Sequence, residues 1–187
     1  SQRLALVDLG RPFPDVGNFL DVEPNYTIFD LSQNLQDLDQ TYIQRIMQPY
    51  GDKLAILHGS ADFKEQDCLD LESLEKIFKI LRSAYRWVVV DLSHWLDSLF
   101  FHVVKEADTV LLLTELTIPD LRNLKRLFPI LQEWSVKEKV KLVVNRCQKG
   151  NGLQLRDLEQ AAQQPVFYSL TSDYPALIKA VNQGTPL

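Results

Sequence analysis

Three polar residues follow nearly continuous apolar runs, and their side chains suit them to bind a metal ion or a nucleotide. They are Asp8, Asp91 and Asn145. A carboxylate in this position can hold a water molecule bound to Mg²⁺ beside nucleotide phosphates, and an Asn amide offers the donor and acceptor that match the edge of adenine. Each residue also has a local explanation, since Asp can cap a following helix and both Asp and Asn favour turns. For Asp8, that turn would be built around Gly10.

The apolar runs themselves predict buried strands. They cover residues 4–7, 87–90 and 140–144, and none shows the regular alternation of a strand with one wet face. Such runs are typical of parallel strands that helices cover on both sides. Because ligands of these sheets bind at the carboxyl ends of the strands, we predict that the three polar residues share one crevice.

Apolar runs and helical patterns alternate along the whole chain, which predicts an α/β fold. The sheet would be doubly wound and mostly parallel, with helices on both faces. Residues 11–36 form the least regular segment and predict a loop with short helical pieces. The expected strands are 3–8, 54–58, 87–92, 109–115, 140–146 and 165–170, and the expected helices lie near 39–49, 70–85, 95–106, 118–134, 154–163 and 174–183.

Composition places the chain among ordinary globular domains. Of its 187 residues, 45% are hydrophobic and 24% are charged, which argues against disorder, and we expect one domain over residues 1–187. The net charge of −5 excludes a global attraction to nucleic acid or anionic lipid. Cys68 and Cys147 stand far apart without the spacing of a disulfide framework or a zinc site. The chain opens with Ser rather than Met, so we expect a piece of a longer protein.

One phosphate-binding motif is absent from the sequence. No Gly-x-x-x-x-Gly-Lys-Ser/Thr occurs, although it is the usual phosphate cradle of folds of this kind. The arrangement of the remaining segments nevertheless resembles the MinD/ParA superfamily of P-loop ATPases, and most closely its CpaE/TadZ-like branch from Flp/Tad pilus assembly. The segments that carry this resemblance, by their order and spacing, are 6–21, 87–93, 107–123, 143–146 and 172–187.

The resemblance implies roles for five residues. Asp91 would hold Mg²⁺ through a water molecule, and Asp8 would be the catalytic carboxylate. Asn145 and Arg146 would lie on the adenine side of the nucleotide, with Asp173 near the base. We therefore expect ATP or ADP with Mg²⁺ in the intact protein, and tight nucleotide binding is not expected of this fragment alone.

Two departures from the family pattern bear on activity. Family members begin with a strand and a Walker A loop that carries two lysines, and this strand would lie mid-sheet between 87–92 and 109–115; the present chain starts after that point. The family's Asp-x-Asp occurs here as Asp8-Leu9-Gly10, so the Asp linked to the attacking water is replaced. Hydrolysis is therefore expected to be slow or absent.

By resemblance, the protein would be a nucleotide-dependent localisation or assembly factor for a pilus or secretion machine. It would form a homodimer, bind proteins of that machine near helix 118–134, and stay in the cytoplasm, recruited to the inner membrane or cell pole without inserting into the membrane. Two alternatives stay open, namely a non-enzymatic scaffold and a ParA-type DNA-partitioning ATPase. The net charge argues against nucleic acid as a partner, and the basic cluster formed by Arg122, Lys125 and Arg126 fits a solvated face as well as a binding surface.

Overall fold

A parallel sheet carries the two aspartates that the sequence singles out. The computed structural model describes residues 4–93, 96–147 and 152–187, apart from the side chains of residues 67 and 68. The chain divides into two compact units, of which the first comprises Ser1–Phe100 with Ile178–Leu187 and the second Phe101–Leu177. We describe each unit by itself.

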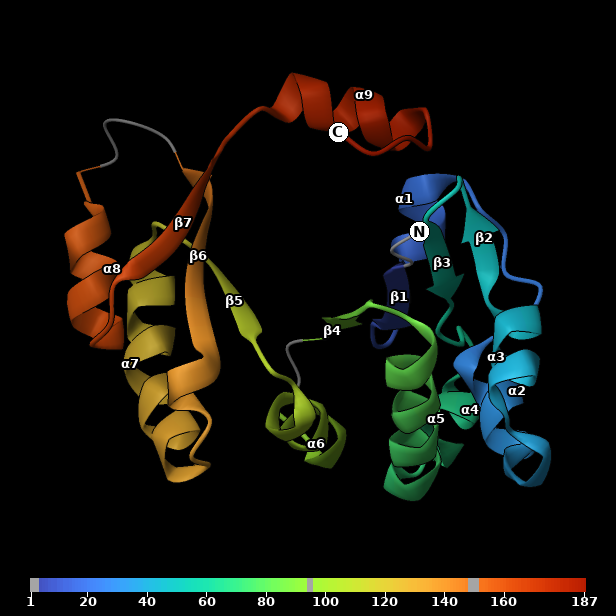
Figure 1. The fold of residues 1–187 in the computed structure, drawn as a ribbon. Helices are drawn as coiled ribbons and strands as arrows, with labels where there is room; N and C mark the ends of the chain where they lie inside the picture. The colour runs from blue at the N-terminus through green and yellow to red at the C-terminus, as the bar shows by residue number, and fades with distance from the viewer. Residues whose placement is uncertain (1–3, 94–95, 148–151) are drawn as a thin grey trace. The chain divides into compact units, whose positions relative to one another are not determined.

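The sheet of the first unit has the strand order β2-β3-β1-β4 (Figure 1). Strands β1 (Leu4–Leu9), β3 (Leu54–Leu57) and β4 (Trp87–Leu92) run parallel, as predicted. The short strand β2 (Gln48–Tyr50) pairs antiparallel with β3 and was not predicted. It is three residues long and contains Pro49, so it lacks the pattern by which strands are recognised.

Helix α5 (Leu71–Ala84) supplies the main apolar face against this sheet. It begins because the Asp70 side chain accepts a hydrogen bond from the backbone N–H of Ser73 at 2.7 Å, which caps the first turn. Its buried stripe recurs at helical spacing and comprises Leu74, Ile77, Phe78 and Leu81. Strand residues Ala5, Val7, Ile56 and Leu57 complete a core with no exposed surface at any of these four side chains.

The segment between β1 and β3 contains short helices, as expected for its irregular sequence. They are α1 (Val16–Leu20), α2 (Ile28–Gln33), the 3₁₀ turn η1 (Leu35–Asp37) and α3 (Gln40–Ile46). Helix α4 (Phe63–Cys68) follows β3. Helices α6 (Ser98–Glu106) and α9 (Tyr174–Asn182) contribute residues to both units.

The second unit has a parallel sheet of order β5-β6-β7. Its strands are β5 (Val110–Glu115), β6 (Val140–Cys147) and β7 (Val166–Thr171), each close to its predicted range. Helices α7 (Ile118–Glu133) and α8 (Leu155–Ala162) lie on one side of this sheet, and the 3₁₀ turn η2 (Lys137–Lys139) precedes β6 (Figure 1). Their apolar residues Leu124, Phe128, Leu158 and Ala162 are buried together with Leu142 and Val144 of the central strand.

Strands β4 and β5 each have one neighbour among the described residues. Strand β4 pairs with β1, and β5 pairs with β6. Large apolar side chains on both strands are about half exposed, at 59% for Trp87 and 56% for Leu111. The additional mid-sheet strand and the single domain expected from the sequence stay predictions. No helix in the described part of the chain is long and apolar enough to cross a membrane.

The core of the first unit leads to a first prediction. Leu74→Ala removes a fully buried side chain of α5 and should lower the free energy of unfolding by about 2–5 kcal/mol. Leu71→Ala, on the same helix but 38% exposed, is the matched control and should cost about 1 kcal/mol or less. Urea unfolding of the full-length protein measures both values, and equal losses would contradict the core assignment.

Candidate functional site

Asp8 and Asp91 are direct neighbours at the carboxyl ends of two paired parallel strands. The register of β1 with β4 sets the two residues opposite each other. Paired positions in adjacent strands direct their side chains to the same face of a sheet. The structure therefore confirms that these two carboxylates come together, whereas Asn145 belongs to the second unit, and its convergence with them stays a prediction.

The Asp8 carboxylate is buried and fastens the loop that follows β1. Asp8 is 1% exposed. Its Oδ1 atom accepts a hydrogen bond from the backbone N–H of Gly10 at 2.8 Å, and its Oδ2 atom accepts one from the backbone N–H of Val16 at 3.0 Å. Burial raises the pKa of Asp8, the two N–H bonds act in the opposite direction, and the charge of Asp15 adds to the increase. A buried carboxylate bonded in this way positions residues 10–16 at the end of the strand.

Gly10 lies close to this carboxylate. A Cβ atom at position 10 would lie 2.9 Å from Asp8 Oδ1 and 3.3 Å from the Cα atom of Pro14. A larger residue at this position would therefore require the Asp8 side chain or the loop to shift.

Asp91 is the accessible member of the pair. Its residue is exposed, yet partial burial of the carboxyl raises its pKa, and the charges of Asp8 and Asp15 raise it further. The negative charges of Asp8, Asp15 and Asp91 together favour a cation at this point. In proteins, Mg²⁺ is commonly held by one or two carboxylates while it keeps several water ligands. The oxygen donors present therefore fit a water-bridged Mg²⁺. No group of three His, Cys, Asp or Glu side chains with metal-binding geometry occurs in the described part of the chain.

A small pocket lies beside Asp8, at the carboxyl ends of β1 and β3. Hydrogen bonds brace its wall, because Arg11 Nη2 donates to the Gln66 carbonyl at 2.7 Å and Gln66 Nε2 donates to the Pro12 carbonyl at 2.8 Å. Arg11 also pairs with Asp97 at 3.7 Å. The pocket is lined by Asp8, Leu9, Gly10, Arg11, Ile28, Phe29, Gly59, Ser60, Glu65, Gln66 and Leu69.

Sequence reasoning missed Arg11, Asp15 and Gln66 as parts of this region. Asp15 influences the pKa of both aspartates, and Arg11 and Gln66 join the loop to α4. The sole local signal for Asp15 was its place before the short helix α1. Contacts between residues about 55 positions apart left no signal in the pattern of a single sequence.

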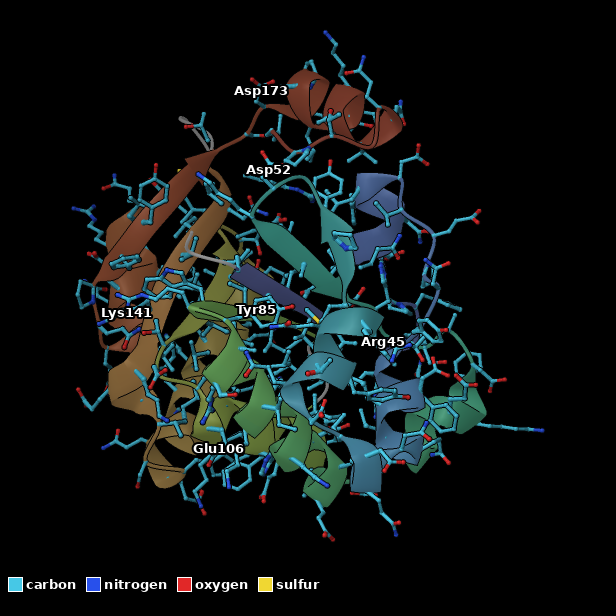
Figure 2. All side chains as sticks on the ribbon, turned by 45° about the vertical axis from the view of Figure 1, so that its right-hand side comes forward. Arg45, Asp52, Tyr85, Glu106, Lys141 and Asp173 are labelled. Atoms are coloured by element: carbon cyan, nitrogen blue, oxygen red, sulfur yellow. The ribbon has the colours of Figure 1, made fainter. Side chains whose placement is uncertain are left out.

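The other three candidate residues lie at the carboxyl edge of the sheet in the second unit. Asn145 Oδ1 accepts the backbone N–H of Arg146 at 2.9 Å, and Arg146 Nη1 pairs with Glu115 at 3.1 Å on the surface. Asp173 follows β7 at the start of α9 (Figure 2), and its Oδ1 accepts the backbone N–H of Ala176 at 3.0 Å. Each thus has a local structural role, and their roles toward a nucleotide stay predictions.

Helix α7 and the histidines have structural settings of their own. Thr117 caps α7, because its Oγ1 accepts the backbone N–H of Asp120 at 3.2 Å. The basic cluster on α7 is exposed to solvent. His58 is 4% exposed, its Nε2 has no hydrogen-bond partner among the residues that the structure describes, and burial lowers the pKa of the imidazole. His94 and Trp95 lie outside the described residues.

Comparison with known proteins identifies sequence relatives. No protein-family model matches the chain. The septum site-determining protein MinD of Bacillus subtilis (strain 168) is 21% identical over 191 residues, which covers 100% of this chain and 70% of the relative. A MinD-named protein of Tupiella akineta is 23% identical over 168 residues, which covers 87% of this chain. The chain spans about half, 53%, of the length of that relative.

Solved structures show the same fold. A ParA family ATPase from Chlorobium tepidum TLS superposes with a TM-score of 0.92 at 19% identity, covering 99% of this chain and 78% of the other. MinD in the MinC:MinD complex of Aquifex aeolicus gives 0.79 at 20% identity, covering 100% and 75%. MinD with Mg-ADP from Pyrococcus horikoshii OT3 gives 0.77 at 18% identity, covering 99% and 74%. The chain therefore has the α/β fold of the MinD/ParA P-loop NTPases.

The carboxylate pair leads to a prediction on pH. Because the folded-state pKa of Asp91 is raised, its ionisation costs more in the folded protein than in the unfolded chain. That cost is present above the folded pKa and absent below the unfolded pKa of about 3.9. Asp91→Asn, measured in EDTA, should therefore raise the free energy of unfolding at neutral pH, with a gain that closes as the pH falls toward about 3.9.

The control for this prediction is Asp52→Asn in the turn between β2 and β3, where the side chain is exposed (Figure 2). It should give no comparable pH-dependent gain. Urea midpoints across the pH range measure both variants, and a loss of stability for Asp91→Asn at neutral pH would contradict the repulsion described above.

Proposed function

We propose that the protein is a CpaE/TadZ-like member of the MinD/ParA ATPases, which acts as a nucleotide-dependent localisation or assembly factor for a pilus or secretion machine. The observation that carries this proposal is the register of Asp8 with Asp91, which sets two carboxylates side by side at the ligand-binding edge of a parallel sheet. The fold and the order of the sequence motifs support it as well.

Asp91 is the residue that we assign to the metal ion. Its carboxylate is accessible, and neighbouring negative charges favour a cation at this point. Mg²⁺ there would neutralise charge on the phosphates of ATP or ADP. The MinD structure from Pyrococcus horikoshii is named as a Mg-ADP complex, which supports this assignment by analogy.

We assign Asp8 to the catalytic position and expect slow hydrolysis. Both of its oxygens accept backbone N–H groups, and the residue is nearly inaccessible to solvent. A carboxylate held in this way can orient a water molecule only through its remaining lone pairs or after the 10–16 loop opens. Gly10, in place of a second Asp, removes the other carboxylate that could position water.

The adenine side of the site is assigned to Asn145, Arg146 and Asp173. Since Asn145 Oδ1 accepts the Arg146 N–H, its amide nitrogen is the group that would donate to the base. The Arg146 side chain extends to Glu115 at the end of β5, and Asp173 holds the first turn of α9. These contacts would keep the strand ends and α9 in fixed positions around a bound base.

Partners of the protein would be a second copy of the chain and proteins of the machine. The exposed basic cluster on α7 suits an acidic protein surface. The MinC:MinD complex of Aquifex aeolicus provides a precedent for protein binding on this fold. We infer a cytoplasmic location with recruitment to the inner membrane or cell pole through such partners.

The second candidate function is that of a non-enzymatic scaffold on the same fold. Gly10, in the place of a second Asp, favours it. Titration of the full-length protein with ATP and Mg²⁺ separates the two functions. We expect binding that weakens about tenfold for Asp91→Ala, which corresponds to about 1.4 kcal/mol, while Asp52→Ala leaves the affinity unchanged. No binding at millimolar ATP would exclude the switch and leave the scaffold.

DNA partitioning is the remaining alternative, and the structural similarity to a ParA family ATPase from Chlorobium tepidum TLS is the reason to test it. A net charge of −5 and a single basic cluster predict weak binding to nonspecific duplex DNA at physiological salt. Fluorescence anisotropy of the full-length protein with ATP and Mg²⁺ measures this affinity. Tight binding that declines steeply with salt and is lost in Arg126→Glu would favour partitioning over pilus assembly.

A further inference from the structure

Of the two outer strands in the second unit, β5 and β7, strand β7 has the larger number of exposed large apolar side chains. Phe167 is 62% exposed, Tyr168 59% and Leu170 42%. No charged residue occurs from Val166 to Ser172. An uncharged strand with this much exposed apolar surface indicates a contact surface, because isolated proteins rarely leave such surface open.

The outer edge of β7 has no strand partner among the described residues. The strand pairs with β6 on its inner side and ends the sheet order. Natural proteins protect such edges with charged side chains, proline or very short strands. Strand β2, the outer strand of the first unit, is protected in this way by its length of three residues and by Pro49.

The other two open edges have a different explanation. Strands β4 and β5 are those beside which the family resemblance places a further strand. Strand β7 is therefore the open edge that has neither a protective residue nor an expected neighbour. The pairing with β6 is irregular at two points, of which the first, between the pairs Leu142–Val166 and Val143–Tyr168, places an extra residue of β7 at Phe167. The second, between the pairs Val144–Ser169 and Cys147–Thr171, places the extra residue in β6, so residues 168–171 of β7 contain no bulge of their own and remain available for pairing.

We propose that β7 pairs antiparallel with β7 of a second copy of this chain, about a two-fold axis at Ser169. In this register Tyr168 faces Leu170 of the second copy, so an aromatic side chain lies against an apolar one. Cross-strand side-chain pairs of this kind are the unit that stabilises antiparallel strands. Because the strand is uncharged, the two copies bring no like charges together, which is why a second copy suits this edge.

The pairing would join the two sheets into one of six strands. The row Leu113–Val143–Tyr168 crosses β5, β6 and β7 on one face, since Leu113 pairs with Val143 and Val143 with Tyr168. The two-fold axis would continue this apolar row into the second copy. A single six-residue strand from each copy provides a small interface, so the affinity should be modest, with a Kd on the order of 10 μM.

This dimer does not depend on the proposed function. No residue of the assigned nucleotide site lies in β7, so the association should be the same with and without ATP and Mg²⁺. A dimer that forms only with nucleotide would instead belong to the proposed switch.

Sedimentation of the full-length protein without nucleotide tests the inference. Ser169→Lys places two ammonium groups opposite each other at the axis and should weaken the dimer at least about tenfold. The matched control is Gln160→Lys, which adds the same charge at an exposed position of α8 in the same unit. It should leave the association unchanged, and circular dichroism checks that both variants fold.

A second measurement does not rely on loss of binding. In the proposed register the two copies of residue 169 face each other with their Cα atoms about 4.5–5.5 Å apart, within disulfide range. Ser169→Cys should therefore form a disulfide-linked dimer under mild oxidation, whereas Gln160→Cys and the wild type, which retains Cys68 and Cys147, should not.

Three results would overturn the proposal. The full-length protein could stay monomeric at a concentration of about ten times the expected Kd, or its dimer could form equally well with Ser169→Lys. The third such result is that the Ser169→Cys variant fails to cross-link in a dimeric sample. Protection of the thiol introduced by Ser169→Cys from alkylation in a monomer would show that another segment of the longer protein covers β7. A dimer that requires ATP and is unaffected by Ser169→Lys would support the proposed function and reject this interface.

Discussion

The buried carboxylate of Asp8 is the constraint on which the candidate site depends. Burying a charge is costly unless hydrogen bonds satisfy it, and here the N–H groups of Gly10 and Val16 do so. These two bonds fix where the chain turns after β1 and where α1 begins. They also leave little room for a side chain at position 10, because its Cβ would lie 2.9 Å from Asp8 Oδ1.

The same carboxylate sets the electrostatics of its neighbour. The strand register holds Asp91 beside Asp8, and partial burial together with the charges of Asp8 and Asp15 raises the pKa of its carboxyl. One aspartate is therefore structural in its contacts, and the other is accessible and favours a cation. In the function that we propose, Asp91 would hold the metal ion, and hydrolysis would be slow because both oxygens of Asp8 accept backbone N–H groups.

The unpaired strand edges bear on how the protein associates with other segments or with a second copy. Backbone N–H and C=O groups at an edge need partners, and the apolar side chains beside them gain free energy when they are covered. Strand β2 pairs with β3, and its short length and Pro49 protect its outer edge, whereas β4, β5 and β7 present open edges among the described residues. These edges are where further parts of a longer protein, or a second copy, would bring the greatest stabilisation.

The sequence alone determined the order and type of the main elements, because apolar runs and helical spacing are local patterns. Residues 87–92 and 71–84 show this most clearly, as a strand and a helix within one residue of their expected bounds. It also singled out Asp8 and Asp91, since both end such runs. Tertiary structure alone decided that Asp8 is buried and accepts hydrogen bonds from Gly10 and Val16. It also decided that the charge of Asp15 raises the pKa of Asp8, and that a hydrogen bond from Arg11 to Gln66 braces the loop. Burial and long-range contacts depend on which segments pack together, and a period of two or 3.6 residues carries no information about that packing.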